Sequence, residues 1–382
     1  MPPDRDPEPV HVFRTFRSDL AALVTWLIAC GIDTVALEST GVYWLPIYEL
    51  LEQHGIVPYL VNARYVKTVP GRKSDWNDAQ WLQKLHALGL LAASFRPDIE
   101  IAALRTLVRY RAELIQHRAP HILHLQKALQ QMNLQLERVL SDIMGVTGQA
   151  IIRAIVAGER DPLTLAKMRN GACKSSTETI AKALTGSWKD ELLFVLPQAL
   201  VISDVYSAQI AVCDSQIAHL LAAMESRGAP CAALPALPAV KDGSKTKNAP
   251  PAQRRAHYAG LLGVDLVAVM GLSASSVQTS ISEIASDIER FASVKQLCAW
   301  LGLAPPHDSS AGKLLRSRTL KVVKRATQAF ERAAQSLSRS DTALGAVLSS
   351  DAGAQRAAPS NSRHGAQARA DREPSLKERR SV

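Results

Sequence analysis

The sequence predicts an α/β domain, then a long helical region and a small all-α C-terminal domain. Three observations lead to this prediction. Strand and helix patterns alternate over the first 95 residues, apolar residues at three-four spacing dominate to about residue 224, and a Pro- and Ala-rich stretch separates a last helical part. The expected divisions are an α/β domain at 1–95, a helical coiled-coil arm at 96–227, a linker at 228–262, a C-terminal domain at 263–345 and a disordered basic tail at 346–382.

In the first domain, short strands are expected to alternate with helices. The expected elements are a strand at 11–16, a helix at 18–30, a buried strand at 34–37, a helix at 43–54 and a strand at 57–61. This order is typical of parallel strands joined by right-handed crossovers. Ligands of such sheets gather beyond the carboxyl ends of the strands, where Glu38 and Asn62 stand.

The middle region carries two runs of apolar residues at three-four spacing. They are Ile115, Ile122, Leu125, Leu129, Met132, Leu136 and Val139, and Ile210, Cys213, Ile217, Leu220 and Met224. Arg111 and Arg118 fall on the first run and interrupt it. This spacing predicts an arm of coiled-coil type, formed within one chain or between chains, and ordinary bundle packing is the equal alternative. Short helices are expected at 145–158 and 163–184.

The C-terminal domain is expected to hold helices around one polar loop. A helix should end near Ile288 and another should cover 291–301, before a loop at 303–313. A basic amphipathic helix is expected at 320–338. After Gly345 the chain loses its apolar periodicity, which is typical of disorder.

Composition narrows the classes of protein to which the chain can belong. The net charge of +10 favours a polyanionic partner. The five cysteines are scattered without CxxC pairs or Cys/His ligand spacing, which argues against a zinc site and a disulfide framework. We find no signal peptide and no apolar run of bilayer-spanning length, so we expect a cytoplasmic, nucleoid-associated protein that does not act at a membrane.

Three carboxylates could meet in the first domain. Asp75 and Asp78 are three residues apart at the start of an expected helix, so they share one face, and Glu38 ends a strand. Clustered carboxylates suit hard divalent cations such as Mg²⁺, which can activate an oxygen nucleophile at a phosphate. The flanking basic residues suit a phosphate backbone; they are Arg64, Lys67, Arg72 and Lys73. The alternative is a helix cap beside a basic surface loop.

A second candidate site surrounds Ser310. A serine in a small Gly-containing loop beside basic groups could attack a phosphodiester, although such a loop is more often a plain flexible connection. The basic residues beside it are Lys313, Arg316, Arg318, Lys321, Lys324 and Arg325. Lys321, Lys324 and Arg325 share one face of the expected helix, which indicates either a nucleic-acid-facing helix or a solvated surface.

Several motifs resemble one family of transposases. They are 35–44 (VALESTGVYW), 60–64 (LVNAR), 70–82 (PGRKSDWNDAQWL), 141–148 (SDIMGVTG), 155–162 (IVAGERDP), 263–266 (GVDL), 300–303 (WLGL) and the Ser310 loop. The chain resembles DEDD-type transposases of the insertion-sequence 110/1111 family over residues 11–345, and it is most similar to the second branch.

The resemblance implies a RuvC-like (RNase H-like) first domain, a coiled-coil middle and a C-terminal transposase domain. It also implies a DNA recombinase guided by a structured RNA from its own element, with active sites assembled between protomers of a dimer or tetramer. By position, Glu38, Asp75 and Asp78 correspond to the second, third and fourth Mg²⁺-binding acids. Ser310 corresponds to the nucleophile, which forms a covalent phosphoserine link to DNA.

The chain departs from the family pattern in three places. The first acid of the family stands in a Gly-(Ile/Val)-Asp context on the first strand, whereas Asp4 and Asp6 lie in a Pro-rich start. The family's Ser-Gly-Gly-Lys reads Ser310-Ala311-Gly312-Lys313, which costs about 1 kcal/mol where the lost glycine needs a positive φ. We expect the basic tail to replace the last helices of the family's transposase domain. We therefore expect a copy truncated at its N-terminus and altered at its C-terminus.

Three functions remain open at this point. The first is a transposase that recombines DNA with Mg²⁺ and Ser310. The second is a catalytically inactive remnant that only binds nucleic acid and oligomerises, which the missing first acid favours. The third is a metal-dependent junction nuclease, which needs the carboxylates but not the serine.

Overall fold

The computed structural model describes residues 5–39, 41–62, 75–224, 234, 248–251, 253–284, 291–304, 307–310, 313–317, 324–337, 340, 342 and 345–346. Side chains are described for these residues except 75–77, 307–310 and 313–317. The chain divides into two compact units, Met1–Arg96 and Pro97–Val382.

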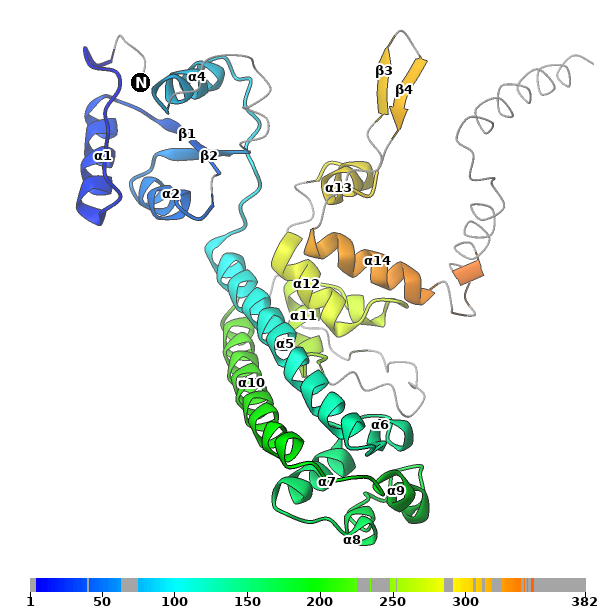
Figure 1. Ribbon diagram of the computed structural model, residues 1–382. Coiled ribbons are helices and arrows are strands. Elements are labelled where there is room, and N and C mark those ends of the chain that lie inside the picture. The colour runs from blue at the N-terminus through cyan, green and yellow to red at the C-terminus, as the bar shows by residue number, and fades with distance from the viewer. Residues whose placement is uncertain are drawn as a thin grey trace, which may run out of the picture. The chain divides into compact units, whose positions relative to one another are not determined.

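The first unit holds a parallel pair of strands between helices (Figure 1). Its elements are α1 (Arg17–Ala29), β1 (Thr34–Glu38), α2 (Trp44–Gln53), β2 (Val57–Val61) and α4 (Asp75–Ala87). Thr34 pairs with Val57 and Glu38 with Val61, so α2 is the crossover that parallel strands require. The core is made by Val24, Leu27, Ile47, Leu51 and Ile56. On the sheet, α4 packs against β1.

The strand expected at residues 11–16 is absent from the described structure, and that prediction was wrong. The segment is irregular, and the rings of His11 and Phe13 pack against Trp26 of α1 at centroid distances of 4.6 and 5.6 Å. Val12 and Phe16 are exposed. The alternation of large residues therefore reflects packing on a helix, not pairing with a strand.

The second unit is built on two long helices, α5 (Ile99–Gln131) and α10 (Asp190–Ala223). Arg111 of α5 contacts Asp214 of α10, and Arg118 contacts Ser207, so residue numbers rise along one helix as they fall along the other. The helices are therefore an antiparallel pair within one chain (Figure 1). Coiled-coil geometry stays a prediction.

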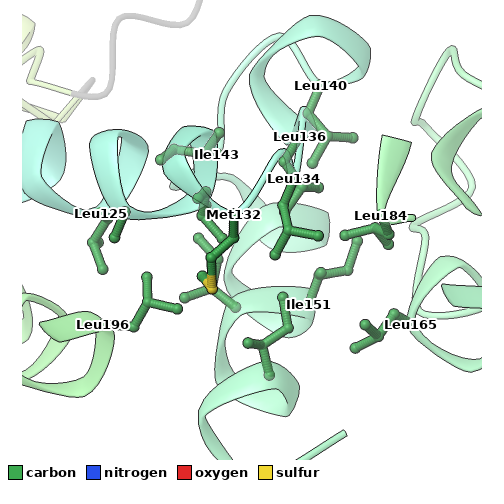
Figure 2. Close-up of a cluster of buried hydrophobic side chains, with 14 of the residues drawn as sticks. Leu125, Met132, Leu134, Leu136, Leu140, Ile143, Ile151, Leu165, Leu184 and Leu196 are labelled. Atoms are coloured by element: carbon green, nitrogen blue, oxygen red, sulfur yellow. The ribbon is translucent and has the colours of Figure 1, made fainter. Parts of the chain in front are cut away.

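A cap of short helices closes the far end of this pair. They are α6 (Leu136–Val139), α7 (Val146–Val156), α8 (Pro162–Ala166) and α9 (Thr177–Ala183). Figure 2 shows their apolar side chains converging with those from the ends of α5 and α10; Met132, Ile151, Leu165, Leu184 and Leu196 are all fully buried. The cap holds the largest described apolar cluster and fixes the turn from α5 to α10.

The C-terminal part of the unit is not all-α, which corrects the sequence prediction. Its elements are α11 (Arg254–Leu262), a 3₁₀ turn η1 (Leu266–Ala268), α12 (Ala274–Ile284), α13 (Val294–Leu301), β3 (His307–Ser310), β4 (Lys313–Ser317) and α14 (Arg325–Leu337). β3 and β4 form an antiparallel pair where a loop was expected. Residues 254–262, expected within the linker, are helical because Arg254 and Tyr258 are buried against α12 and α10.

One described helix, α10, is long and apolar enough to cross a membrane by length and composition alone. This finding corrects the sequence analysis, which found no apolar run of that length. Core helices of globular proteins pass the same test, and one face of α10 packs on α5.

Candidate functional site

The carboxylate candidates lie on two packed elements of the first unit. Glu38 is the last residue of β1 and is half-buried, and Asp78 is exposed in the first turn of α4. Asp75 begins α4, but its side chain lies outside the described set. The packing of α4 on β1 brings the helix that carries two acids to the strand that carries the third.

A hydrogen bond anchors α4 to the sheet at its other end. Thr34 Oγ1 and His86 Nε2 are 2.7 Å apart, and the His86 ring lies 4.9 Å from the Tyr59 ring, centroid to centroid. His86 is in the last turn of α4, and Thr34 begins β1. The C-terminal end of α4 is therefore fixed against the start of β1.

Asp6, one of the two aspartates near the start of the sequence, is bound by a side chain of α1. Its carboxylate accepts a hydrogen bond of 2.7 Å from the indole nitrogen of Trp26 and one of 2.7 Å from the backbone of Glu8. These hydrogen bonds hold the pKa of Asp6 below its usual range, and the bond from Trp26 has the largest effect. Asp4 lies outside the described residues. Among the described side chains, no three His, Cys, Asp or Glu residues converge as a metal site.

Ser310 occupies the end of a strand, which corrects the expectation of a loop position. It is the last residue of β3 and pairs with Lys313, the first of β4, while Asp308 pairs with Arg316. Directly paired residues share a face of a hairpin. Ser310 and Lys313 therefore occupy the same face, and Ser309 pairs on the other face with Leu314.

The structure describes the side chains of only some of the basic residues that the sequence suggested for nucleic-acid binding. Arg64, Lys67, Arg72, Lys73, Arg318 and Lys321 lie outside the described residues, and the side chains of Lys313 and Arg316 are not described. Lys324 precedes α14 and does not share a helix face with Arg325. Its ammonium lies 3.9 Å from the centroid of the Trp300 ring and donates to the Trp300 carbonyl oxygen, and burial lowers its pKa.

Arg325, at the start of α14, does have a described partner. Its guanidinium is 3.7 Å from a carboxylate oxygen of Glu113 on α5. Both side chains are more than a third exposed, so this ion pair leaves the arginine within reach of a polyanion.

Sequence reasoning missed a polar network that fastens the C-terminal part to the long helices. Arg111 and Arg254 both bind the carboxylate of Asp214, and Arg254 also donates to Gln278 Oε1 at 2.8 Å. The hydroxyl of Tyr258 donates to the same oxygen at 2.6 Å. The signal was present in the sequence, because a basic residue on an apolar seam needs a buried acid opposite it.

A second part of this attachment joins α5 to the C-terminal end of α12. Arg105 donates to the carbonyl oxygens of Ser282 and Glu283 at 2.9 and 3.0 Å, and Arg109 binds the Glu283 carboxylate with two bonds of 2.8 and 2.7 Å. Cations at a helix C-terminus satisfy its last carbonyl groups and its dipole.

Two family models match the chain. Residues 10–134, which include Glu38, Asp75 and Asp78, match a transposase model for the DEDD domain of the IS110 type. Residues 266–347, which include Ser310, match the model described as transposase IS116/IS110/IS902 family. No protein of curated function matches the chain significantly. Because the two models together cover more than half of its length, the chain belongs to the IS110/IS116/IS902 family of insertion-sequence transposases.

Proposed function

We propose that this transposase cuts and rejoins DNA with Mg²⁺ held by Glu38, Asp75 and Asp78 and with Ser310 as the nucleophile. The observation that carries the proposal is the packing of α4 on β1, which puts the three acids on two contacting elements. Both matched regions contribute, because the acids fall in the first and the serine in the second. A RuvC-like fold for the first unit is part of this proposal.

The length of the two elements supports the meeting of the acids. Asp78 is eight residues before His86, a helical rise of about 12 Å, and Glu38 is four residues after Thr34, a strand length of about 13 Å. The contact of His86, in the last turn of α4, with Thr34, at the start of β1, fits an antiparallel course of the helix along the strand. An antiparallel course of α4 along β1 would therefore set Asp78 level with Glu38.

The donor set suits a hard divalent cation. Carboxylate oxygens are the ligands that Mg²⁺ prefers, and Asp75 and Asp78 stand one helical turn apart. Bound there, Mg²⁺ would neutralise charge on the phosphate and stabilise the leaving oxygen. The three carboxylates of the chain would position it and share its charge.

At Ser310, the reaction would exchange one ester bond for another. The Oγ atom bonds to the phosphorus of a DNA phosphodiester, the bond from phosphorus to one sugar oxygen breaks, and the serine proton goes to a base while the freed sugar oxygen is protonated. The product is a phosphoserine link to DNA. Attack by a hydroxyl of another DNA end reverses these steps and rejoins the strands.

The proposal extends to the partners of the protein. A structured RNA from the element would guide the choice of donor and target DNA, and several copies would assemble in the cytoplasm at the nucleoid. The residues that we expect to contact nucleic-acid phosphates are Arg64, Lys67, Arg72, Lys73, Lys313, Arg316, Arg318, Lys321 and Arg325. Lys324 is withdrawn from this set because Trp300 holds its ammonium.

Strand cleavage by carboxylate variants tests this function. The purified protein is incubated with DNA that carries the element end, the transcript of the flanking DNA, and Mg²⁺, and the cut strands are separated on a denaturing gel. Asp78→Asn should lose about a hundredfold or more in cleavage. Asp33→Asn, the same change at the opposite end of β1, should cleave like the wild type. Equal cleavage by Asp78→Asn would remove the carboxylates from the proposal.

A second candidate function is a chain that binds nucleic acid without cleaving it. The hydrogen bond from Trp26 to Asp6 favours it, because this carboxylate is then engaged by the protein itself and less suited to hold a metal ion. In the same assay, this candidate predicts that the wild type shifts the DNA on a native gel but leaves it uncut.

A further inference from the structure

The chain leaves the C-terminal end of α13 to form the Ser310 hairpin, which consists of β3 and β4, and then begins α14 (Figure 1). The helix α13 ends at Leu301, and α14 begins at Arg325. Among the strands that the structure describes, β3 and β4 pair only with each other. A two-stranded pair alone is marginally stable in water, so the position of Ser310 depends on how the two ends of the hairpin are held.

The outgoing chain binds two of the last four carbonyl groups of α13, which have no partner within the helix. Gly302 follows the helix in the left-handed conformation, with a φ of 75°. Its N–H donates to the carbonyl oxygen of Ala299 at 3.0 Å. The N–H of Leu303 donates to the carbonyl oxygen of Cys298 at 2.9 Å. This glycine-based helix end sets the direction in which the chain departs towards β3.

The returning chain binds the other two carbonyl groups, through contacts that we call the α13 clasp. The ammonium of Lys324 donates to the carbonyl oxygen of Trp300 and lies 3.9 Å from the centroid of the Trp300 ring. The hydroxyl of Thr327, in the first turn of α14, donates to the carbonyl oxygen of Leu301 at 2.5 Å. Thr327 is buried, so its hydroxyl depends on this partner. The end of α13 therefore holds both the outgoing and the returning chain.

Apolar packing and charge both support the α13 clasp. Leu301 of α13 and Ala326 of α14 are buried together with Ile284 of α12, and Trp300 packs against this cluster. A cation at the C-terminal end of a helix is favoured by the helix dipole, and an ammonium over an indole ring gains from cation–π attraction. These interactions favour one position of the start of α14 against the end of α13.

We propose that Lys324 and Thr327 are positioning residues for Ser310, because they hold the base of the Ser310 hairpin on the end of α13. The inference rests on the proposed function, in which Ser310 attacks DNA. In this role neither residue touches the DNA or the reacting atoms. The α13 clasp restricts both ends of the hairpin and so narrows the range of positions that the nucleophile can take. A misplacement of about 1 Å can cost about a hundredfold in rate.

The rate at which the phosphoserine link forms, measured against DNA concentration, tests this role. Lys324→Met removes the charge, and we expect the maximal rate to fall by about tenfold to a hundredfold while the half-saturating DNA concentration stays unchanged. Lys324→Arg keeps a cation that can donate to a carbonyl oxygen and stack on the indole, and it should recover most of the rate. Lys295→Met, which changes an exposed lysine of α13, is the matched control and should react like the wild type.

Hydrogen exchange of the full chain without DNA tests the α13 clasp independently of any reaction. In Lys324→Met and in Thr327→Val, the amide hydrogens of β3 and β4 should exchange about tenfold faster than in the wild type. Those of α11 should keep the wild-type rate, because Arg254 and Tyr258 fasten that helix separately. Mass spectrometry of peptic peptides measures both rates, and this contrast distinguishes a loosened hairpin from a destabilised C-terminal part.

An unchanged maximal rate in Lys324→Met, or unchanged exchange of β3 and β4, would overturn the proposal. A raised half-saturating DNA concentration with an unchanged maximal rate would also overturn it, because Lys324 would then bind DNA. A wild type that forms no phosphoserine link would refute the proposed function and, with it, the positioning role. The exchange rates would still show whether the α13 clasp holds the hairpin, so the two failures are distinguishable.

Discussion

Arg111 of α5 and Asp214 of α10 form a two-bond ion pair, with Nε 2.8 Å from Oδ1 and Nη2 3.1 Å from Oδ2. The Arg111 side chain is 7% exposed, and the same carboxylate receives Arg254, which is 2% exposed. One acid therefore neutralises two buried guanidinium groups and joins the long helices to α11. This ties the C-terminal region that contains Ser310 to the helices of the arm.

Removing the charge of Asp214, which Arg111 and Arg254 share, should destabilise the folded protein. In Asp214→Asn, two buried arginines lose their counter-charge, and we expect the free energy of unfolding to fall by about 3–5 kcal/mol. Denaturant unfolding followed by circular dichroism measures this. Asp204→Asn is the matched control on the same helix, because its pair with Arg153 is half-exposed; it should cost less than about 1 kcal/mol. Equal losses in the two variants would contradict the role of Asp214.

Tyr258 should make stability depend on pH at the alkaline end. Burial raises the pKa of Tyr258 well above its usual value of 10, so the folded state keeps the phenol proton that the unfolded chain releases. Its contribution to stability is therefore complete below pH 10 and is lost as the pH rises above it. Tyr258→Phe should flatten this fall and, by losing the bond to Gln278, cost about 1 kcal/mol at neutral pH. Denaturant unfolding curves of both proteins, measured from about two pH units below the usual tyrosine pKa to about two units above it, would show the difference. Identical pH profiles of the wild type and the variant would contradict the prediction.

Lys324 and Arg72 should differ in how they affect DNA binding. Because Trp300 holds the ammonium of Lys324, Lys324→Ala should leave the slope of log affinity against log salt unchanged. Arg72→Ala should reduce the slope by about 1, as expected when one phosphate contact is lost. Fluorescence anisotropy with labelled DNA over a range of salt measures both slopes. A reduced slope for Lys324→Ala would return that residue to the nucleic-acid-binding set.

Gly148 should not tolerate a side chain. A Cβ atom there would lie 2.1 Å from the carbonyl oxygen of Ile143, inside the helical cap. Gly148→Ala should therefore lower the free energy of unfolding by about 1–3 kcal/mol. Gly171→Ala is the control, since its Cβ would have no neighbour within 4 Å, and it should not destabilise. The urea midpoints of the two variants and the wild type measure these changes. A Gly148→Ala variant with the wild-type midpoint would contradict the close packing of Gly148 against Ile143.

The sequence was most informative where one local pattern indicates a single type of element. The strands that end at Glu38 and Val61 are short apolar runs, and the helix that begins at Asp75 follows a turn; all three are present in the structure. The pattern at 11–16 was misleading because alternation does not distinguish a strand from rings that pack on Trp26. Residues 303–313 were predicted to form a loop, although His307–Ser310 and Lys313–Ser317 pair as antiparallel strands.

The sequence signalled that Arg111 needs a buried acid, but which acid it binds could not be predicted, for a different physical reason. Arg111 was recognised as an interruption of an apolar seam, but its partner Asp214 is 103 residues away. Such a pair can be predicted only when the antiparallel register of α5 and α10 is known. The proposed meeting of Glu38 with Asp78 depends in the same way on the register of α4 against β1.

The central claim is that Ser310 forms a bond to DNA, and a trapped adduct tests it most directly. The protein is incubated with element-end DNA, the flanking transcript and Mg²⁺, then denatured, and DNA-linked protein is digested and analysed by mass spectrometry. The wild type and Ser309→Ala, whose change lies on the other face of the hairpin, should give an adduct on the peptide that contains Ser310. Ser310→Ala should give none, and an equal adduct in Ser310→Ala would contradict the account.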